Sequence, residues 1–228
     1  MRAFVAVLPP PEVIDQLTSF LEPRRDALAA ADTYPRWRWT RPEHFHLTLA
    51  FLPELDEWRE ESLEEEGMRW AARATPLTLR LAGAGAFPDP GAARVLWAAV
   101  REEPTEPEES EKSGESENSG EATGPAESEK LEESDERGQS GLRAWAAATR
   151  ALASRAGARV DGTRFSPHVT VARVAGRPGP AGHLVQALDT LHTDAWTADE
   201  VCLIRSHLGQ GPRGTPRYEV LQTWPVGH

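Results

Sequence analysis

The chain has 228 residues, of which 39% are hydrophobic, and it carries a formal net charge of −11. That content suffices for one sizeable domain, and no apolar run approaches the roughly 18 residues that a membrane span requires. The apolar start of the chain is broken by prolines at positions 9–11, which argues against a secretory signal, and we expect a cytoplasmic protein. The single cysteine, Cys202, excludes an internal disulfide and a zinc site made of thiolates.

The first half of the chain alternates between apolar strands and helices. Side chains near 3.6-residue spacing, such as Val13 and Leu17, predict a helix after the first strand, and Pro35 follows its end. Asp56 precedes a second helical pattern and is expected to cap it. The predicted elements are strands at residues 2–8, 36–40, 45–52, 77–81 and 94–100, helices at 10–31 and 56–74, and a turn-rich passage at 83–91.

Residues 102–141 differ in composition from the rest of the chain. From Glu102 to Ser140 there are fifteen acidic and three basic residues, a net charge of −12, so the remainder of the chain carries +1. With one leucine and no aromatic residue, this stretch cannot bury enough apolar surface to offset its ordering entropy. We predict a disordered, solvated insertion within a single domain spanning residues 1–228. Alternatively, the tethered polyanion competes with an anionic substrate for local arginine clusters.

The second half repeats the organisation of the first. Its predicted elements are a helix at 142–156 that Gly157 ends, a strand at 165–173, a helix at 184–191 and strands at 200–207 and 218–224. Each half contains a His-x-Thr strand with a helix and further strands. This repetition predicts a pseudo-symmetric α+β protein.

Two matching tetrapeptides stand out in these strands. His46-Leu47-Thr48-Leu49 returns as His168-Val169-Thr170-Val171. Because alternate side chains of a strand share a face, His46, Thr48 and Ala50 are predicted on one face, and the apolar residues 45, 47, 49 and 51 on the face toward the core. A histidine and a threonine two residues apart can contact the same small anion. Two copies predict a site that brings both pairs together.

Two histidines on opposite sides of a phosphorus atom can act as base and acid. The unperturbed pKa of histidine is near 6.5, so one imidazole accepts a proton from water while the other protonates the leaving oxygen. Thr48 and Thr170 would donate hydrogen bonds to the non-bridging oxygens. This chemistry requires no metal and no cofactor.

Other sites are less favoured by the sequence. His44 and His46 form a His-x-His pair, but no cluster of Asp, Glu or Cys accompanies them, which argues against a metal site. No glycine-rich phosphate loop and no Gly-x-Ser-x-Gly elbow is present. The histidines expected at the surface are His183, His192, His207 and His228.

The motifs, taken in order, resemble the 2H phosphoesterase superfamily, and within it the RNA 2′,3′-cyclic phosphodiesterases, also called the 2′-5′ RNA ligase family. That superfamily is named for its two His-x-Thr motifs, and the resemblance covers nearly the whole chain except the insertion. The residues that carry it are 2–9, 39–52, Gly85-Ala86-Phe87-Pro88, Arg94-Val95-Leu96-Trp97, 165–173, and Ser206-His207-Leu208 near Tyr218.

The resemblance implies a bilobal α+β fold with two antiparallel sheets facing a central cleft and helices outside. It implies hydrolysis of RNA 2′,3′-cyclic phosphate ends to 2′-phosphates, with His168 as base, His46 as acid, and Thr48 and Thr170 holding the phosphate. Arg173 matches a family arginine that contacts the substrate end. Strand alternation puts Arg173 on the face opposite His168. Arg173 can therefore contact the substrate only if the strand contains a bulge or ends at this point.

Several functions stay open on the sequence alone. The same residues could hydrolyse another cyclic or 2′-5′ phosphodiester, or catalyse 2′-5′ ligation as the reverse reaction. A non-catalytic protein that binds RNA ends is an alternative of another class, although binding alone does not require two titratable groups on opposed strands. The expected partner is RNA or an oligonucleotide with a cyclic phosphate end, bound by a monomer that does not associate with membranes.

Overall fold

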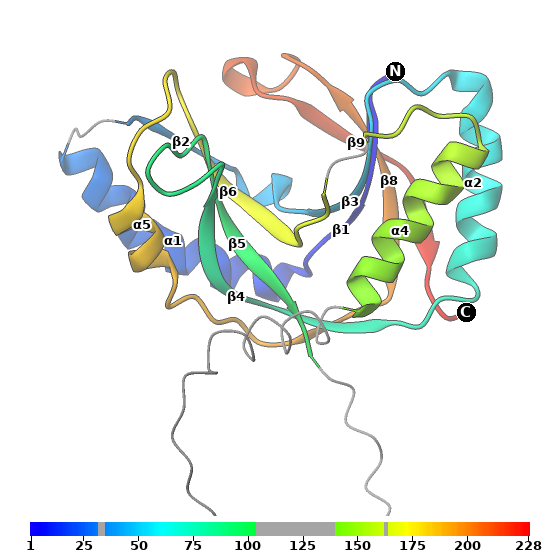
Figure 1. Cartoon of the computed structure of the whole chain (residues 1–228), viewed down its shortest axis with the longest axis horizontal. Coiled ribbons are helices and arrows are strands. Elements are labelled where there is room, and N and C mark those ends of the chain that lie inside the picture. Colours follow the sequence, from blue (N-terminus) through cyan, green and yellow to red (C-terminus); the bar gives the residue numbers. More distant parts are fainter. Residues whose placement is uncertain (32–34, 104–139, 162–163) are drawn as a thin grey trace, which may run out of the picture.

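The computed structural model describes residues 1–31, 35–103, 140–161 and 164–228. Within them the chain forms nine strands and four α-helices, which confirms the predicted α+β class (Figure 1). No helix in these ranges is long and apolar enough to cross a membrane. The elements are β1 (Ala3–Val7), α1 (Pro11–Ala31), β2 (Trp37–Trp39), β3 (Leu47–Leu52), α2 (Glu57–Ala71), β4 (Leu77–Phe87), β5 (Val95–Glu102), α4 (Ser140–Arg155), β6 (His168–Val174), α5 (Gly182–Leu188), β7 (Trp196–Ala198), β8 (Glu200–His207) and β9 (Arg217–Pro225).

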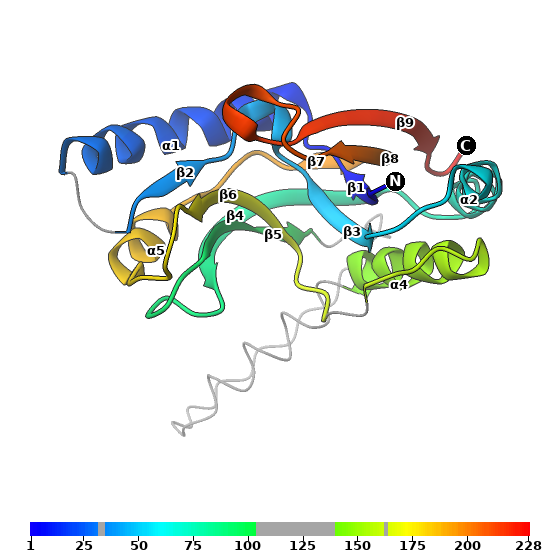
Figure 2. The same cartoon turned by 90° about the horizontal axis from the view of Figure 1, so that it is seen from above.

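The strands form one curled antiparallel sheet with two halves. Its order is β7-β4-β5-β6-β3-β1-β8-β9, and β2 pairs with the far end of β6. Among the described residues, the two halves are joined only between β3 and β6, through the single pair Leu47 and Val169. The two sheets that the resemblance implied are therefore the halves of this one sheet, whose curvature is visible in Figure 2. Both His-x-Thr strands lie at the junction.

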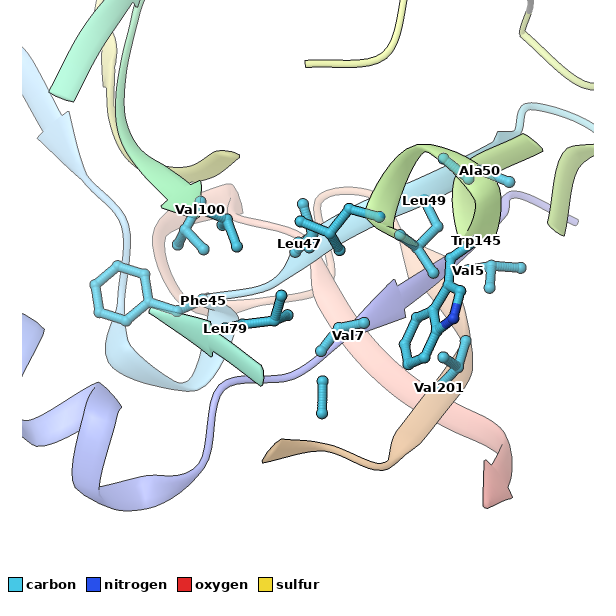
Figure 3. Packing of buried hydrophobic residues seen from close by; sticks show 14 of the residues in the cluster. Val5, Val7, Phe45, Leu47, Leu49, Ala50, Leu79, Val100, Trp145 and Val201 are labelled. Carbon is cyan, nitrogen blue, oxygen red and sulfur yellow. The ribbon is translucent and has the colours of Figure 1, made fainter. Parts of the chain in front are cut away.

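The core joins the halves and their helices. Leu47 and Leu49 of β3 are buried with Leu79 and Val100 from the other half of the sheet, and with Trp145 of α4 (Figure 3). Burial of each such large side chain contributes about 1.5 to 3 kcal/mol. In Figure 1, α1 and α5 lie beside one half, while α2 and α4 cover the other. This packing fixes β3 and β6 relative to each other.

The flanks of the acidic stretch lie side by side. The backbone N–H of Leu142, in the first turn of α4, donates to Oε2 of Glu102 at the end of β5, at 3.0 Å. A carboxylate at this position satisfies one of the free N–H groups of a helix N-terminus. The predicted insertion at 102–141 itself falls almost entirely outside the described residues.

One element prediction was wrong in extent, and one strand was missed. The turn-rich passage predicted from residue 83 is a strand up to Phe87, because β4 continues through an irregularity near Gly83, whose φ is +80°. Gly85 lies within this strand, and a side chain there would overlap the indole of Trp97. The short strand β7 was not predicted. Asp56 does occupy the N-cap position of α2, but its side chain makes no capping hydrogen bond.

Candidate active site

Each His-x-Thr motif is followed by a β-bulge. On β3, Leu49 is an extra residue, because its neighbours Thr48 and Ala50 pair with consecutive residues of β1. On β6, Val171 is extra in the same way, opposite consecutive residues of β5. A bulge shifts the alternation of side chains by one residue. The residues after each bulge therefore change face.

The bulge on β3 corrects the predicted faces of two residues. Ala50 is buried in the main core, on the face opposite Thr48, whereas Phe51 packs on the site face. There Phe51, like Tyr218, packs against a small buried cluster that includes Phe4, and the guanidinium of Arg2 lies 4.7 Å from the ring centroid of Phe51. The prediction that Ala50 shares the His46 face was wrong, because simple alternation holds only up to Thr48.

The bulge on β6 brings Arg173 to the face of His168 and Thr170. Thr170 pairs with Trp97 and Arg173 pairs with Val95, and these two residues of β5 point the same way. The electrostatic influence of Arg173 reaches both histidines and lowers the pKa of each. The bulge that the predicted role of Arg173 requires is thus present.

The two motifs face each other across the junction. With Leu47 opposite Val169, an antiparallel register sets His46 opposite Thr170 and Thr48 opposite His168. All four side chains are partly exposed. Within the described residues, neither threonine hydroxyl has a hydrogen-bond partner. The sequence-predicted pairs are therefore together, with hydroxyls available to a ligand.

Both imidazoles are held by the same kind of hydrogen bond. Nδ1 of His46 lies 2.7 Å from the carbonyl oxygen of His44, and Nδ1 of His168 lies 2.7 Å from that of Ser166. A carbonyl can only accept, so Nδ1 carries the hydrogen in each ring and donates it. Nε2 is left as the nitrogen that can bind or release a proton. The two rings are thereby oriented alike.

Aromatic side chains enclose each imidazole. The ring of His46 packs against Phe4 at 4.7 Å and against Tyr218 at 5.5 Å between centroids. The ring of His168 packs against Phe87 at 5.0 Å and Trp97 at 6.2 Å. These contacts come from different strands, and only a tertiary structure reveals them, although Phe87, Trp97 and Tyr218 lie in the motifs that carry the resemblance.

Burial lowers the pKa of both site histidines. Desolvation is the largest cause, and it takes the pKa of His46 from 6.5 to about 4, with smaller contributions from Arg173 and His168. The pKa of His168 is lowered for the same main reason. Both rings are therefore neutral near pH 7 in the ligand-free protein.

The depressed pKa of His46 predicts a loss of stability in mild acid. An unfolded His46 binds a proton near pH 6.5 and the folded one only near pH 4, so the stabilisation is complete above pH 6.5 and lost as the pH falls toward 4. Between pH 7.5 and pH 5 the free energy of unfolding should fall by about 2 kcal/mol more in the wild type than in His46→Gln. Urea unfolding at both pH values measures this difference, and equal pH dependence of the two proteins would contradict it.

A groove of about 700 Å³ opens beside His168. Its wall contains the aromatic rings of Phe87, Trp97 and Phe165. It is also lined by three arginines, namely Arg101, Arg143 and Arg164. Ligand-binding clefts commonly have volumes of about 300 to 1,000 Å³. This groove can accommodate a planar ring together with anionic groups.

Of the remaining histidines, only His44 borders the site, because its carbonyl oxygen accepts the hydrogen bond of His46 and its ring lies on Tyr218. The ring of His44 packs on Tyr218 at 4.6 Å between centroids, and within the described ranges no three His, Cys, Asp or Glu side chains gather as for a metal ion. His207 binds Glu219 at 2.6 Å, and His192 contacts Arg80. His183, His192 and His228 are exposed, as predicted, whereas His207, also expected at the surface, is partly buried.

The sequence is similar to known phosphoesterases. The profile of the family described as LigT-like phosphoesterase matches residues 7–97 and 133–213, about three quarters of the chain. An RNA 2′,3′-cyclic phosphodiesterase of Thermus thermophilus is 31% identical over 232 residues, covering 99% of this chain and 90% of that relative. A protein of the same description from Geobacillus stearothermophilus is 26% identical and covers 86% of this chain, which spans only 50% of that relative's length.

Solved structures share the fold. The structure of TT0787 of Thermus thermophilus has a TM-score of 0.64 and 26% identity, and the match covers 100% of this chain and 98% of that one. LigT of E. coli in its apo form has a TM-score of 0.59 at 24% identity, with 100% and 98% coverage. At this identity, the match to LigT shows a shared fold alone.

Proposed function

The chain belongs to the LigT-like phosphoesterase family, and on that premise we propose that it hydrolyses RNA 2′,3′-cyclic phosphate ends to 2′-phosphates by acid–base catalysis. The observation that carries the proposal is the pairing of the two His-x-Thr motifs on one face of the sheet junction. The Thermus and Geobacillus relatives are described as RNA 2′,3′-cyclic phosphodiesterases, which supports the choice of reaction.

Each site residue has a place in this reaction. His168 takes a proton from water through Nε2, and the water oxygen attacks phosphorus. The bond from phosphorus to the 3′ oxygen breaks, and Nε2 of His46 protonates that oxygen, which leaves the phosphate on the 2′ oxygen. Thr48 and Thr170 donate hydrogen bonds to the non-bridging oxygens, and Arg173 offsets their negative charge. The hydrogen bonds at Nδ1 keep both rings in the tautomer that these steps require.

The acid step requires a protonated His46. In the ligand-free protein burial lowers the pKa of His46 to about 4, and the positive charge of Arg173 adds to this effect. A phosphate between the two motifs counteracts the positive charge of Arg173 and favours the protonated imidazole. We therefore infer that substrate binding raises the pKa of His46, so the acid is formed in the complex.

An RNA substrate is consistent with the groove beside His168. Proteins that recognise single-stranded RNA stack bases on aromatic side chains and place Arg near its phosphates. Phe87, Trp97 and Phe165 supply rings in this groove, and its arginines supply positive charge. A small cyclic phosphate that carries no base would leave this groove empty.

A panel of substrates tests the proposal. Purified protein in excess EDTA is incubated with an oligonucleotide ending in a 2′,3′-cyclic phosphate, a free 3′,5′-cyclic nucleotide and a 2′-5′ linked dinucleotide. We expect turnover of the first substrate to be fastest, to survive the chelator and to yield a 2′-phosphate. Faster turnover of another substrate would reassign the reaction within phosphodiester chemistry. Tight binding without turnover of any substrate would favour an RNA-end binding protein.

A further inference from the structure

The short strand β2 presents Arg38 on the site face. Its two tryptophans, Trp37 and Trp39, are partly buried and pack against the main core. They also line a cavity of about 390 Å³ behind the sheet, to which α1 contributes Arg25. Because alternate residues of a strand face opposite ways, Arg38 points away from this cavity. Arg38 is exposed, as expected for the uncovered face.

The register of β2 sets Arg38 directly opposite Arg173. On either side of this pair, Trp39 is opposite Ala172 and Trp37 is opposite Val174, on the other face. Arg173 itself faces the histidines because of the bulge at Val171. Two arginines from neighbouring strands therefore lie next to each other at one end of the site.

This arrangement opposes like charges. Directly opposite like charges destabilise an antiparallel pair of strands. Both guanidinium groups belong to exposed residues, and among the described residues neither has a carboxylate partner. Departures from the usual pairing rules tend to lie at functional sites, where a ligand completes the interaction. An anionic group between or beside the two arginines would do so.

The two arginines differ in their distance from the histidines. Arg173 acts electrostatically on His46, His168 and Tyr218. It is therefore close enough to the histidines to interact with the reacting phosphate. Arg38 lies one strand further out, about 5 Å away, on β2 at the edge of the described sheet. It is thus positioned for a second anion further along the same ligand.

Resting on the function proposed above, we propose that Arg38 binds the 5′ phosphate of the terminal nucleotide. In an RNA chain the next charge beyond a 2′,3′-cyclic phosphate is the phosphodiester on the 5′ side of the same ribose. A guanidinium matches two oxygens of such a group at once. Arg38 is then a specificity-determining residue, which favours RNA ends over nucleoside 2′,3′-cyclic phosphates.

Binding measurements test this inference without relying on turnover. Calorimetry compares adenosine 2′-phosphate with adenosine 2′,5′-bisphosphate, which differ only in the 5′ phosphate. We expect the wild type to bind the bisphosphate about tenfold more tightly, and Arg38→Gln to lose this preference while binding the monophosphate as before. The matched control, Arg25→Gln on the far side of the sheet, should keep the preference.

The outcomes separate this inference from the proposed function. Absence of a preference in the wild type, or an equal preference in Arg38→Gln, would overturn the role of Arg38. An equal loss of affinity for both ligands in Arg38→Gln would also overturn it, because the residue would then act on the reacting phosphate. If instead the proposed function is wrong, the protein will not hydrolyse RNA 2′,3′-cyclic phosphate ends, whatever its affinity for the bisphosphate.

Discussion

Replacement of His168 by alanine is expected to lower kcat on an RNA 2′,3′-cyclic phosphate at least about 100-fold, and His46→Ala is expected to do the same. Each variant removes one proton transfer while the water, the phosphate and the opposite histidine remain. Initial rates with an oligonucleotide substrate measure the loss. Activity retained in both variants would end the two-histidine mechanism.

The fold should survive both replacements. Neither ring is in the main core, and each makes its hydrogen bond through Nδ1 to a local carbonyl. Circular dichroism and thermal unfolding check this point. His183→Ala removes an exposed histidine on α5 and serves as the control, with unchanged activity.

The roles of the two histidines can be separated with a modified leaving group. A substrate with sulfur in place of the 3′ oxygen leaves as a thiolate, which does not require protonation. We expect this substrate to restore much of the activity of His46→Ala and little of that of His168→Ala. The opposite pattern would exchange the assignments of acid and base.

Replacement of either threonine by valine is expected to lower kcat about 100-fold, the usual effect of losing one donor to the charge that develops in a transition state. Valine keeps the branched shape of threonine and removes only the hydroxyl, so packing on the strand is retained. Steady-state kinetics of Thr48→Val and Thr170→Val measure the effect. Thr48→Ser and Thr170→Ser should retain most of the activity.

The control for this series is Thr197→Val, an exposed position on β7 away from the site, which should leave kcat unchanged. An increase in KM with unchanged kcat in the Thr48 and Thr170 variants would show that the hydroxyls bind the ground state and transition state equally. That result would contradict their proposed role at the developing charge.

The repeated motif allowed the centre of the site to be predicted from the sequence. His46, Thr48, His168 and Thr170 lie on apolar strands whose alternation is visible in the sequence, and the pairing of Leu47 with Val169 brings these strands together. Alternation failed after each motif, because a bulge depends on the register with a neighbouring strand. The faces of Ala50, Phe51 and Arg173 could not be derived without that register.

The limits of the elements were less predictable where glycine is frequent. Residues 83–87 contain two glycines, which usually indicate a turn. In the structure Gly85 instead leaves room for the indole of Trp97, which in turn packs near His168. Such a close approach between strands depends on tertiary packing, and no local pattern reveals it. The pairing of Arg38 with Arg173 was hidden for the same reason.

The most direct measurement follows the phosphorus signal of an RNA oligonucleotide that ends in a 2′,3′-cyclic phosphate. The oligonucleotide is incubated in EDTA with the wild-type protein or with the double variant His46→Ala/His168→Ala, and ³¹P NMR distinguishes the cyclic diester from the monoester. We predict that only the wild type converts the signal to that of a 2′-phosphate. Equal conversion by the double variant would contradict the central role of the two histidines.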